Sequence, residues 1–198
     1  QVKTSAYRQY IETHQLQAHI LELARPAVVK GRASFEQASR EIAEVFGTHN
    51  LDDEVVREIS AAYEALDGTP AVAVRSSANA EDLPGLSFAG QQETFLNVTG
   101  TAAVIAAVRD CWASLWTPQA ISYRHQNGID QGSVAMAVVI QVMVPSEVSG
   151  ILFTANPATG ERNELIINAG FGLGEAVVSG QVTPDTYIFD RVKNVVTQ

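Results

Sequence analysis

The chain has 198 residues, of which 46% are hydrophobic, and its 13 Lys and Arg against 22 Asp and Glu give a formal net charge of -9. This length suits one sizeable domain or two small lobes, and the acidic balance excludes a broad electrostatic surface for nucleic acid. The longest apolar runs, such as 135–140, are far shorter than a membrane span, so we expect no membrane segment and a cytoplasmic location.

The first third of the chain, residues 1–66, is predicted to be helical and to serve packing. Apolar residues recur at helical spacing as far as Pro26. Ser34 and Gln37 stand in the positions of a capping box for a second helical stretch, which Gly47 is expected to end. A third amphipathic helix completes this part.

After a turn at 67–70 the pattern becomes extended. Residues 71–74 predict a short strand, residues 76–90 a loop and residues 95–98 a second strand. The clearest helix of the chain follows and carries Cys111 on its wide apolar face. This thiol is the only one, which excludes an intrachain disulfide, and we expect it to pack as a small hydrophobic group.

From residue 133 the chain is predicted to be rich in β-strands. Strands are expected at 134–144, 149–154 and 164–168, and the last two are expected to pair as a hairpin. A glycine-rich loop at 169–174 and a final strand around residue 188 complete an α+β layout. The expected parts are a helical segment (1–66), a segment with strands and helices around a phosphate loop (67–132) and a β-rich lobe (133–198).

A first polar cluster lies where the strand 71–74 is predicted to end and where the next strand begins. Its members are Arg75, Ser76, Ser77, Gly90, Gln91 and Thr94. A planar cation with neighbouring hydroxyls and small residues suits the phosphates of a nucleotide, although the pattern is no standard P-loop. The alternative is a polar loop in which Arg75 forms an ion pair with Glu81 or Asp82.

Two further clusters are weaker signals. Gln141, Met143 and Val144 end the most hydrophobic strand, where backbone groups and a thioether would suit a nucleotide base, whereas the alternative places Met143 in the core. Glu175 follows a run of glycines and would suit a ribose or a metal ion, and its alternative is an exposed residue in a tight turn. Thr154 and Gln181 flank this last region.

Four separated blocks together resemble one known family. These blocks are VRSSANAEDLPGLSFAGQQETFLNV, CWASLWTPQAISYRHQNGID, VVIQVMVPSEVSGILFTANPATG and AGFGLGEAVVSGQVTPDTY. They are similar in order and spacing to the N-terminal ATP-binding domain of phosphoenolpyruvate synthases, pyruvate phosphate dikinase and rifampicin phosphotransferase. The resemblance implies an ATP-grasp-like, two-lobed fold and an enzyme that passes a phosphoryl group from ATP to a histidine on a swivelling domain, and from there to pyruvate.

The resemblance also implies roles for individual residues. By matching position, Arg75 would contact the phosphates in the catalytic role, and the region of Gly90 with Thr94 would form the covering loop. Residues 141–144 would line the adenine, and Glu175 and Gln181 would border the nucleotide. The implied partners are ATP, the phosphocarrier histidine domain and the pyruvate-binding domain of a longer protein.

The sequence departs from the family pattern in ways that leave alternatives open. A glycine-rich segment with a lysine and a segment of magnesium ligands are expected outside these residues, so we expect a partial domain that is inactive alone. The alternatives are the ATP-binding domain of a rifampicin phosphotransferase and a binding module without catalysis. Asn79 and Asn156 stand where relatives often have Thr and Asp.

Overall fold

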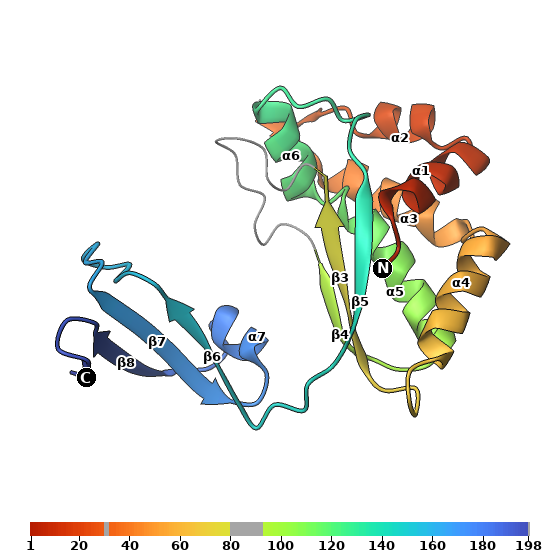
Figure 1. The fold of residues 1–198 in the computed structure, drawn as a ribbon. Helices are drawn as coiled ribbons and strands as arrows, with labels where there is room; N and C mark the ends of the chain where they lie inside the picture. Colours follow the sequence, from red (N-terminus) through yellow and green to blue (C-terminus); the bar gives the residue numbers. More distant parts are fainter. Residues whose placement is uncertain (30–31, 80–92, 198) are drawn as a thin grey trace. The chain divides into compact units, whose positions relative to one another are not determined.

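The structure is a computed structural model of residues 1–198, and it describes residues 1–29, 32–79 and 93–197. The chain forms two compact units, Gln1–Met143 and Val144–Gln198 (Figure 1). The three functional parts expected from the sequence are a different division of the chain, and they stay a prediction.

The first unit contains six helices among its described residues. They are α1 (Thr4–Thr13), α2 (Gln17–Leu23), α3 (Glu36–Thr48), α4 (Asp53–Glu64), α5 (Thr101–Ser114) and α6 (Pro118–Gln126). The predicted helical stripes are confirmed, because their central apolar residues are almost fully buried, with Ile42 at 0%, Tyr10 at 1% and Tyr63 at 2% exposure. Such stripes bury one face of each helix in a common core.

The predicted capping box at the start of α3 is wrong. Ser34 ends a short strand, β2 (Arg32–Ser34), which pairs with β1 (Ala27–Val29) in a hairpin that the sequence pattern did not indicate. Glu36 takes over the capping contacts, because its carboxylate accepts hydrogen bonds from the Ser34 hydroxyl and, at 3.1 Å, from the Phe35 amide. These contacts, the Ser34 hydrogen bond foremost, lower the pKa of Glu36.

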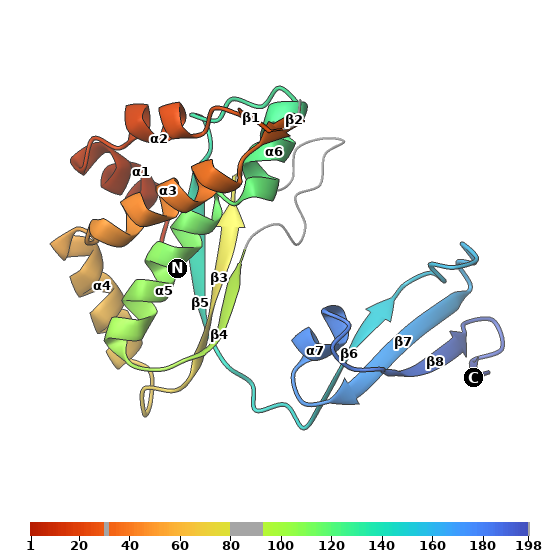
Figure 2. The same ribbon diagram turned by 180° about the vertical axis from the view of Figure 1, so that it is seen from behind.

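A three-stranded antiparallel sheet supports the first unit. Its order is β4 (Thr94–Val98), β3 (Val72–Ala78) and β5 (Met136–Val142). Figures 1 and 2 show the helices of this unit on one face of the sheet, with α5 directly against β3. The interface is dry and apolar, since Val74, Cys111 and Trp112 have no exposed surface.

The central strand β3 is longer than predicted. It runs to Ala78, so Arg75, Ser76 and Ser77 lie inside the strand and not in a loop after it. The cause is pairing with β5, which continues without interruption from Val72 to Ala78. Cross-strand pairing of this kind outweighs the low strand preference of two consecutive serines.

The second unit is a four-stranded antiparallel sheet with one short helix. The strands follow each other as β6 (Val148–Phe153), β7 (Glu164–Phe171), β8 (Asp185–Asp190) and β9 (Val195–Val196), and the helix is α7 (Gly174–Val178). The predicted hairpin of β6 and β7 and the α+β class are confirmed. The predicted glycine-rich loop is wrong in its extent, because Ala169, Gly170 and Phe171 belong to β7.

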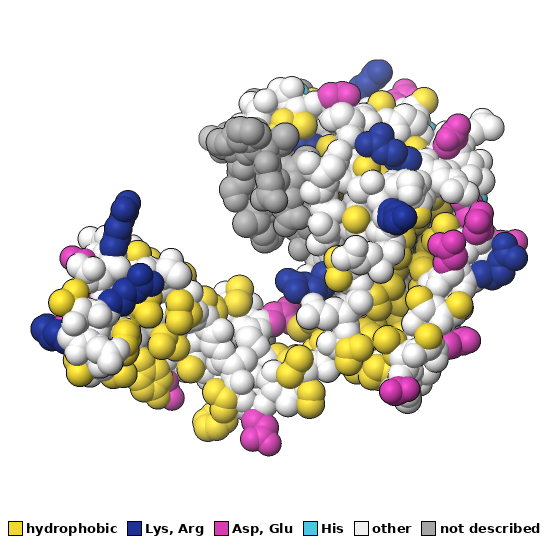
Figure 3. All heavy atoms as spheres, in the orientation of Figure 1, with side chains coloured by type: hydrophobic (Ala, Val, Ile, Leu, Met, Phe, Trp, Pro, Cys, Tyr) yellow, Lys and Arg dark blue, Asp and Glu magenta, His cyan; other side chains and the backbone are white. Residues whose placement is uncertain are grey.

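The second unit buries few hydrophobic side chains. Among its described residues, Ile166 and Val177 are the buried ones, whereas Phe171 is 87% exposed and Leu152 is 52% exposed. Figure 3 shows hydrophobic side chains gathered on the visible face of this sheet. In the described part of the whole chain, no helix has the length and apolar character to cross a membrane.

Candidate functional site

A group of polar side chains lies on the face of the first sheet that points away from α5. Successive side chains of a strand point to opposite faces, so Arg75 and Ser77 share the face opposite to buried Val74. Thr94 of β4 lies directly opposite Arg75, and Gln141 of β5 lies opposite Ala73. We call Arg75, Ser77, Thr94 and Gln141 the polar sheet face.

Arg75 is the centre of the polar sheet face. Its side chain is exposed, and Nη1 donates a hydrogen bond of 3.3 Å to Oε1 of Gln141. This contact orients the exposed guanidinium, whose remaining N–H groups suit a planar or tetrahedral anion. The arrangement is therefore a cation held on a rigid strand between two hydroxyl groups, those of Ser77 and Thr94.

Ser76 lies on the other side of β3 and makes a structural contact. Its hydroxyl donates to the backbone oxygen of Glu93 at 3.1 Å, which ties β3 to the start of β4. On the same side, Cys111 of α5 lies with Sγ 3.7 Å from the backbone oxygen of Val74. Burial raises the pKa of this thiol to about 12, so it is protonated at neutral pH and packs as a small hydrophobic group, as predicted.

Asn79 supports the end of β3, a role that the sequence analysis missed. Its Oδ1 accepts a hydrogen bond from the Ala135 amide at 2.8 Å, and its Nδ2 donates to the Ser133 oxygen at 3.2 Å. The backbone amide of Asn79 also donates to the Ala135 oxygen at 3.0 Å. The only sequence feature that could have indicated this role is an Asn directly after a strand. Its three hydrogen bonds determine where the pairing of β3 and β5 ends.

The remaining first-unit candidates lie at the end of β5 or outside the described residues. The Met143 amide donates to the Ala71 oxygen at 2.9 Å. The Met143 side chain is half-buried, whereas that of Gln141 is exposed. Gly90 and Gln91 lie outside the described residues, as do Glu81 and Asp82 of the alternative interpretation.

The second unit carries the other candidates. Val144, its first residue, is 67% exposed. Glu175 is exposed in the first turn of α7, and the Gln181 amide donates to the Ala176 oxygen at 3.1 Å, so these two candidates share one turn of chain. Thr154 follows the C-terminal end of β6, the end that lies farther from α7. Five residues of strand, roughly 17 Å, separate it from the end of β6 near α7, so the structure does not group Thr154 with Glu175.

The described residues do not form a metal site. Nowhere in residues 1–29, 32–79 and 93–197 do three His, Cys, Asp or Glu side chains come close enough together to hold an ion.

Comparisons with known proteins give one consistent result. A family model described as "Pyruvate phosphate dikinase, AMP/ATP-binding domain" matches residues 1–198. A probable phosphoenolpyruvate synthase of Archaeoglobus fulgidus is 47% identical over 201 residues, which cover 100% of this chain and 27% of that protein. The phosphoenolpyruvate synthase of Pyrococcus furiosus is 46% identical over 91% of this chain and 23% of its own length.

Rifampicin phosphotransferases are similar to the chain as well. That of Streptomyces sviceus is 46% identical over 94% of this chain and 21% of its own length. The chain thus spans about a quarter of the length of the curated relatives that it matches.

Proposed function

Because the chain belongs to the family of pyruvate phosphate dikinase AMP/ATP-binding domains, whose fold is ATP-grasp-like, we propose that it is the nucleotide-binding part of a longer phosphotransferase of the phosphoenolpyruvate synthase type. The observation that carries the proposal is Arg75, an exposed guanidinium oriented by Gln141 on a rigid strand. The parent protein would transfer a phosphoryl group from ATP to a histidine on a swivelling domain and then to pyruvate.

The polar sheet face has the chemistry that this proposal needs. Phosphoryl transfer develops charge on the phosphate oxygens, and positioned cations and hydrogen-bond donors stabilise it. Arg75 donates to those oxygens, while Ser77 and Thr94 donate from either side. The strand holds these groups before ATP arrives, so little ordering is needed when it binds.

We assign the rest of the nucleotide contacts as follows. Residues 141–144 meet the base, Glu175 accepts hydrogen bonds from the ribose, and Gln181 lies beside it. Gly90 and Gln91 would cover the phosphates, and Thr154 is the least supported candidate because it lies far from Glu175 along the sheet. The family resemblance implies that the magnesium ligands lie in other parts of the parent protein. We place the parent protein in the cytoplasm, where ATP is available.

The test is binding of Mg-ATP to the parent protein by titration calorimetry. Arg75→Ala should weaken binding by about 10- to 100-fold, because a hydrogen bond to a charged group contributes about 1.5–3 kcal/mol. Arg57→Ala removes an equally exposed arginine on α4 and should leave binding unchanged. Equal affinity of the two variants would refute the role of Arg75.

The second unit is tested separately with Glu175→Gln, which keeps the shape of the side chain and removes its charge. Its matched control is Glu147→Gln, another exposed glutamate of the same unit. We expect weaker nucleotide binding for the first variant alone. Phosphorylation of pyruvate by the parent protein would support the synthase type, and phosphorylation of rifampicin would identify the alternative branch of the family.

A further inference from the structure

The outer edge of β5 already carries the beginning of another strand. Among the described residues β5 is an edge strand of its sheet, and β3 occupies its inner side. On its outer side Val2 forms an antiparallel bridge to Val138. Both hydrogen bonds of the bridge are 2.8 Å long, from the Val2 amide to the Val138 oxygen and from the Val138 amide to the Val2 oxygen.

This bridge sets the register of anything that continues it. In an antiparallel ladder one chain advances as the other recedes, and pairs of the hydrogen-bonded kind recur at every second residue. The residue directly ahead of Gln1 would therefore lie opposite Ile140, with both hydrogen bonds formed. Its side chain would point to the same face as Val2 and Ile140.

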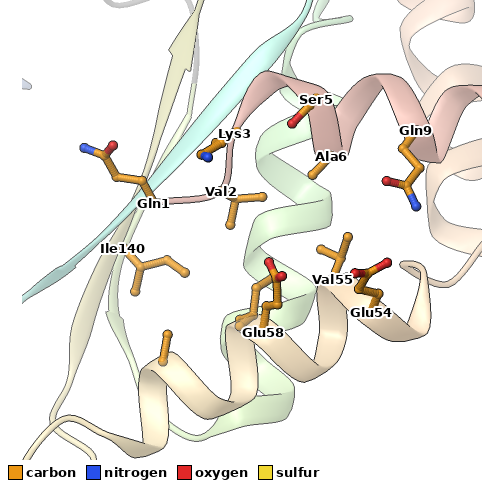
Figure 4. A pocket seen from close by; sticks show the side chains of 12 residues that line it. Gln1, Val2, Lys3, Ser5, Ala6, Gln9, Glu54, Val55, Glu58 and Ile140 are labelled. Carbon is orange, nitrogen blue, oxygen red and sulfur yellow. The ribbon is translucent and has the colours of Figure 1, made fainter.

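A pocket lies at the place where that side chain would arrive. It has a volume of about 400 Å³ and lies between the N-terminal segment, α4 and β5, with one side open to solvent. Figure 4 shows Val2, Val55 and Ile140 around the open space. Ile59 and Ala62 of α4 extend this apolar side of the pocket, whereas the rest of the lining is mostly polar and includes Lys3, Glu54 and Glu58.

We propose that the outer edge of β5 from Ile140 to Val142, together with this pocket, is the docking site for an extended segment of the parent polypeptide that runs antiparallel to β5 ahead of Gln1. The residue directly ahead of Gln1 is apolar and fills the pocket, and the residue before it faces the side of Gln141. The occupant is the same polypeptide because the Val2 bridge already sets the direction and register of the pairing. Attachment at Gln1 also gives this segment a high effective concentration at the edge.

The geometry fits a strand better than a small ligand. A strand covers three residues of β5 in roughly 10 Å and satisfies the backbone groups that an edge strand otherwise presents to solvent. Pairing of this kind draws affinity from main-chain hydrogen bonds and specificity from alternate side-chain pockets. Neither Arg75 nor Glu175 takes part in this pairing, which needs no nucleotide, although Gln141 and Val142 at this edge also belong to the residues that we assign to the base.

The test compares two N-terminal extensions of identical composition, each joined directly to Gln1. Thr-Thr-Val puts the valine opposite Ile140 and into the pocket, whereas Thr-Val-Thr turns it to the other face. Amide hydrogen exchange of Ile140, measured by NMR, should be about tenfold slower with Thr-Thr-Val than with Thr-Val-Thr, because burial of a valine side chain is worth about a factor of ten or more. Thermal unfolding should shift upward in the same order.

One control variant and three possible results decide the outcome. Ile140→Ala in the Thr-Thr-Val chain removes the opposite side chain and should abolish most of the difference in exchange. Equal exchange in both extended chains would overturn the proposal. So would a dimer, detected by light scattering, that persists in the Thr-Thr-Val chain with unchanged exchange at Ile140, because a second copy would then be the occupant. A proline or a charged residue directly ahead of Gln1 in the parent gene would overturn it as well.

Discussion

At the scale of single residues, a buried polar contact inside each unit contributes to its stability. In the first unit Trp116 Nε1, just after the end of α5, donates to the buried Tyr7 hydroxyl of α1 at 3.1 Å. In the second unit Asn156, only 8% exposed, closes the turn between β6 and β7. A buried donor or acceptor that loses its partner is costly, so each contact yields a sharp prediction.

Tyr7 makes the first unit sensitive to alkali. Burial raises its pKa to about 12 from an ordinary value of 10.0. Between these values the folded state binds more protons than the unfolded state, so stability is fully present below pH 10 and is lost as pH rises towards 12. Tyr7→Phe should flatten this decline, measured by urea unfolding at several pH values.

The same variant should lose stability at pH 7. Trp116 Nε1 would lose its partner, at a cost of about 1–3 kcal/mol. Tyr10, whose pKa burial also raises to about 12, still titrates in the variant. Arg124, whose pKa burial lowers to about 10, acts in the opposite sense and interacts electrostatically with Tyr7, so the change in the variant reports both groups. Tyr187→Phe, at a half-exposed tyrosine, is the control, and an unchanged alkaline slope in Tyr7→Phe would contradict the assignment.

Asn156→Asp should destabilise the second unit at neutral pH. The Asn156 Oδ1 accepts from the amides of Ala158 and Thr159, and Nδ2 donates to Oε2 of Glu164 at 2.6 Å. An aspartate keeps the first two contacts but places a carboxylate against Glu164, which would raise the pKa of one member of the pair. The loss should be about 1–3 kcal/mol and should disappear as pH falls and that carboxylate binds a proton.

The compensating change gives the matched control. Glu164→Gln in the Asn156→Asp background restores a donor next to an acceptor and should recover stability at pH 7. A loss that is the same at pH 4.5 and pH 7 would show that repulsion is not its cause.

At the scale of elements, the helices followed from the sequence and several strands did not. The buried face of a helix such as α3 can be predicted from the sequence, because helical spacing places its apolar residues on one side. The extension of β3 through Ser77 was missed because it depends on β5, a strand far away in sequence. The extension of β7 through Gly170 was missed for the same reason, because it depends on the pairing of β7 with β6.

Gly150 shows what that pairing requires. A Cβ at this position would lie 2.6 Å from the Asn168 backbone oxygen and 3.2 Å from the Ala169 Cα, so the strands β6 and β7 approach too closely for any side chain. Gly150→Ala should therefore destabilise the second unit by about 1–3 kcal/mol, as overpacking does. Hydrogen exchange of the β7 amides would measure the loss.

A matched glycine exists in the first unit. Gly47 lies inside α3 with nothing within 4 Å of its added Cβ. Gly47→Ala should stabilise the first unit by about 0.5–1 kcal/mol, because alanine loses less backbone entropy on folding than glycine. Destabilisation by both substitutions would contradict the argument from close approach.

At the scale of the whole molecule, the candidate site was predictable only in part. Arg75, Thr94 and Gln141 were chosen from separate stretches of sequence, and the sheet register places them on one face. The separation of Ser76 from this face follows from strand alternation, which a predicted loop did not include.

The two units also differ in how much apolar surface they bury, and this predicts their order of unfolding. The large core cluster lies within the first unit, whereas Ile166 and Val177 are the buried hydrophobic residues among those described in the second. Since hydrophobic burial is the main favourable term in folding, the second unit should unfold at lower urea concentration. Both tryptophans, Trp112 and Trp116, are buried in the first unit, so their fluorescence reports that unit alone.

Urea titration of this chain should therefore show a loss of β-sheet circular dichroism before the tryptophan transition. Gly150→Ala should move only the early transition and Gly47→Ala only the late one, because each substitution acts on a different core. Coincident transitions by both probes are the mark of two-state unfolding and would contradict separate cores. Mg-ATP added to the parent protein should move both transitions upward if residues of both units bind it, since a ligand stabilises whatever folded part it contacts.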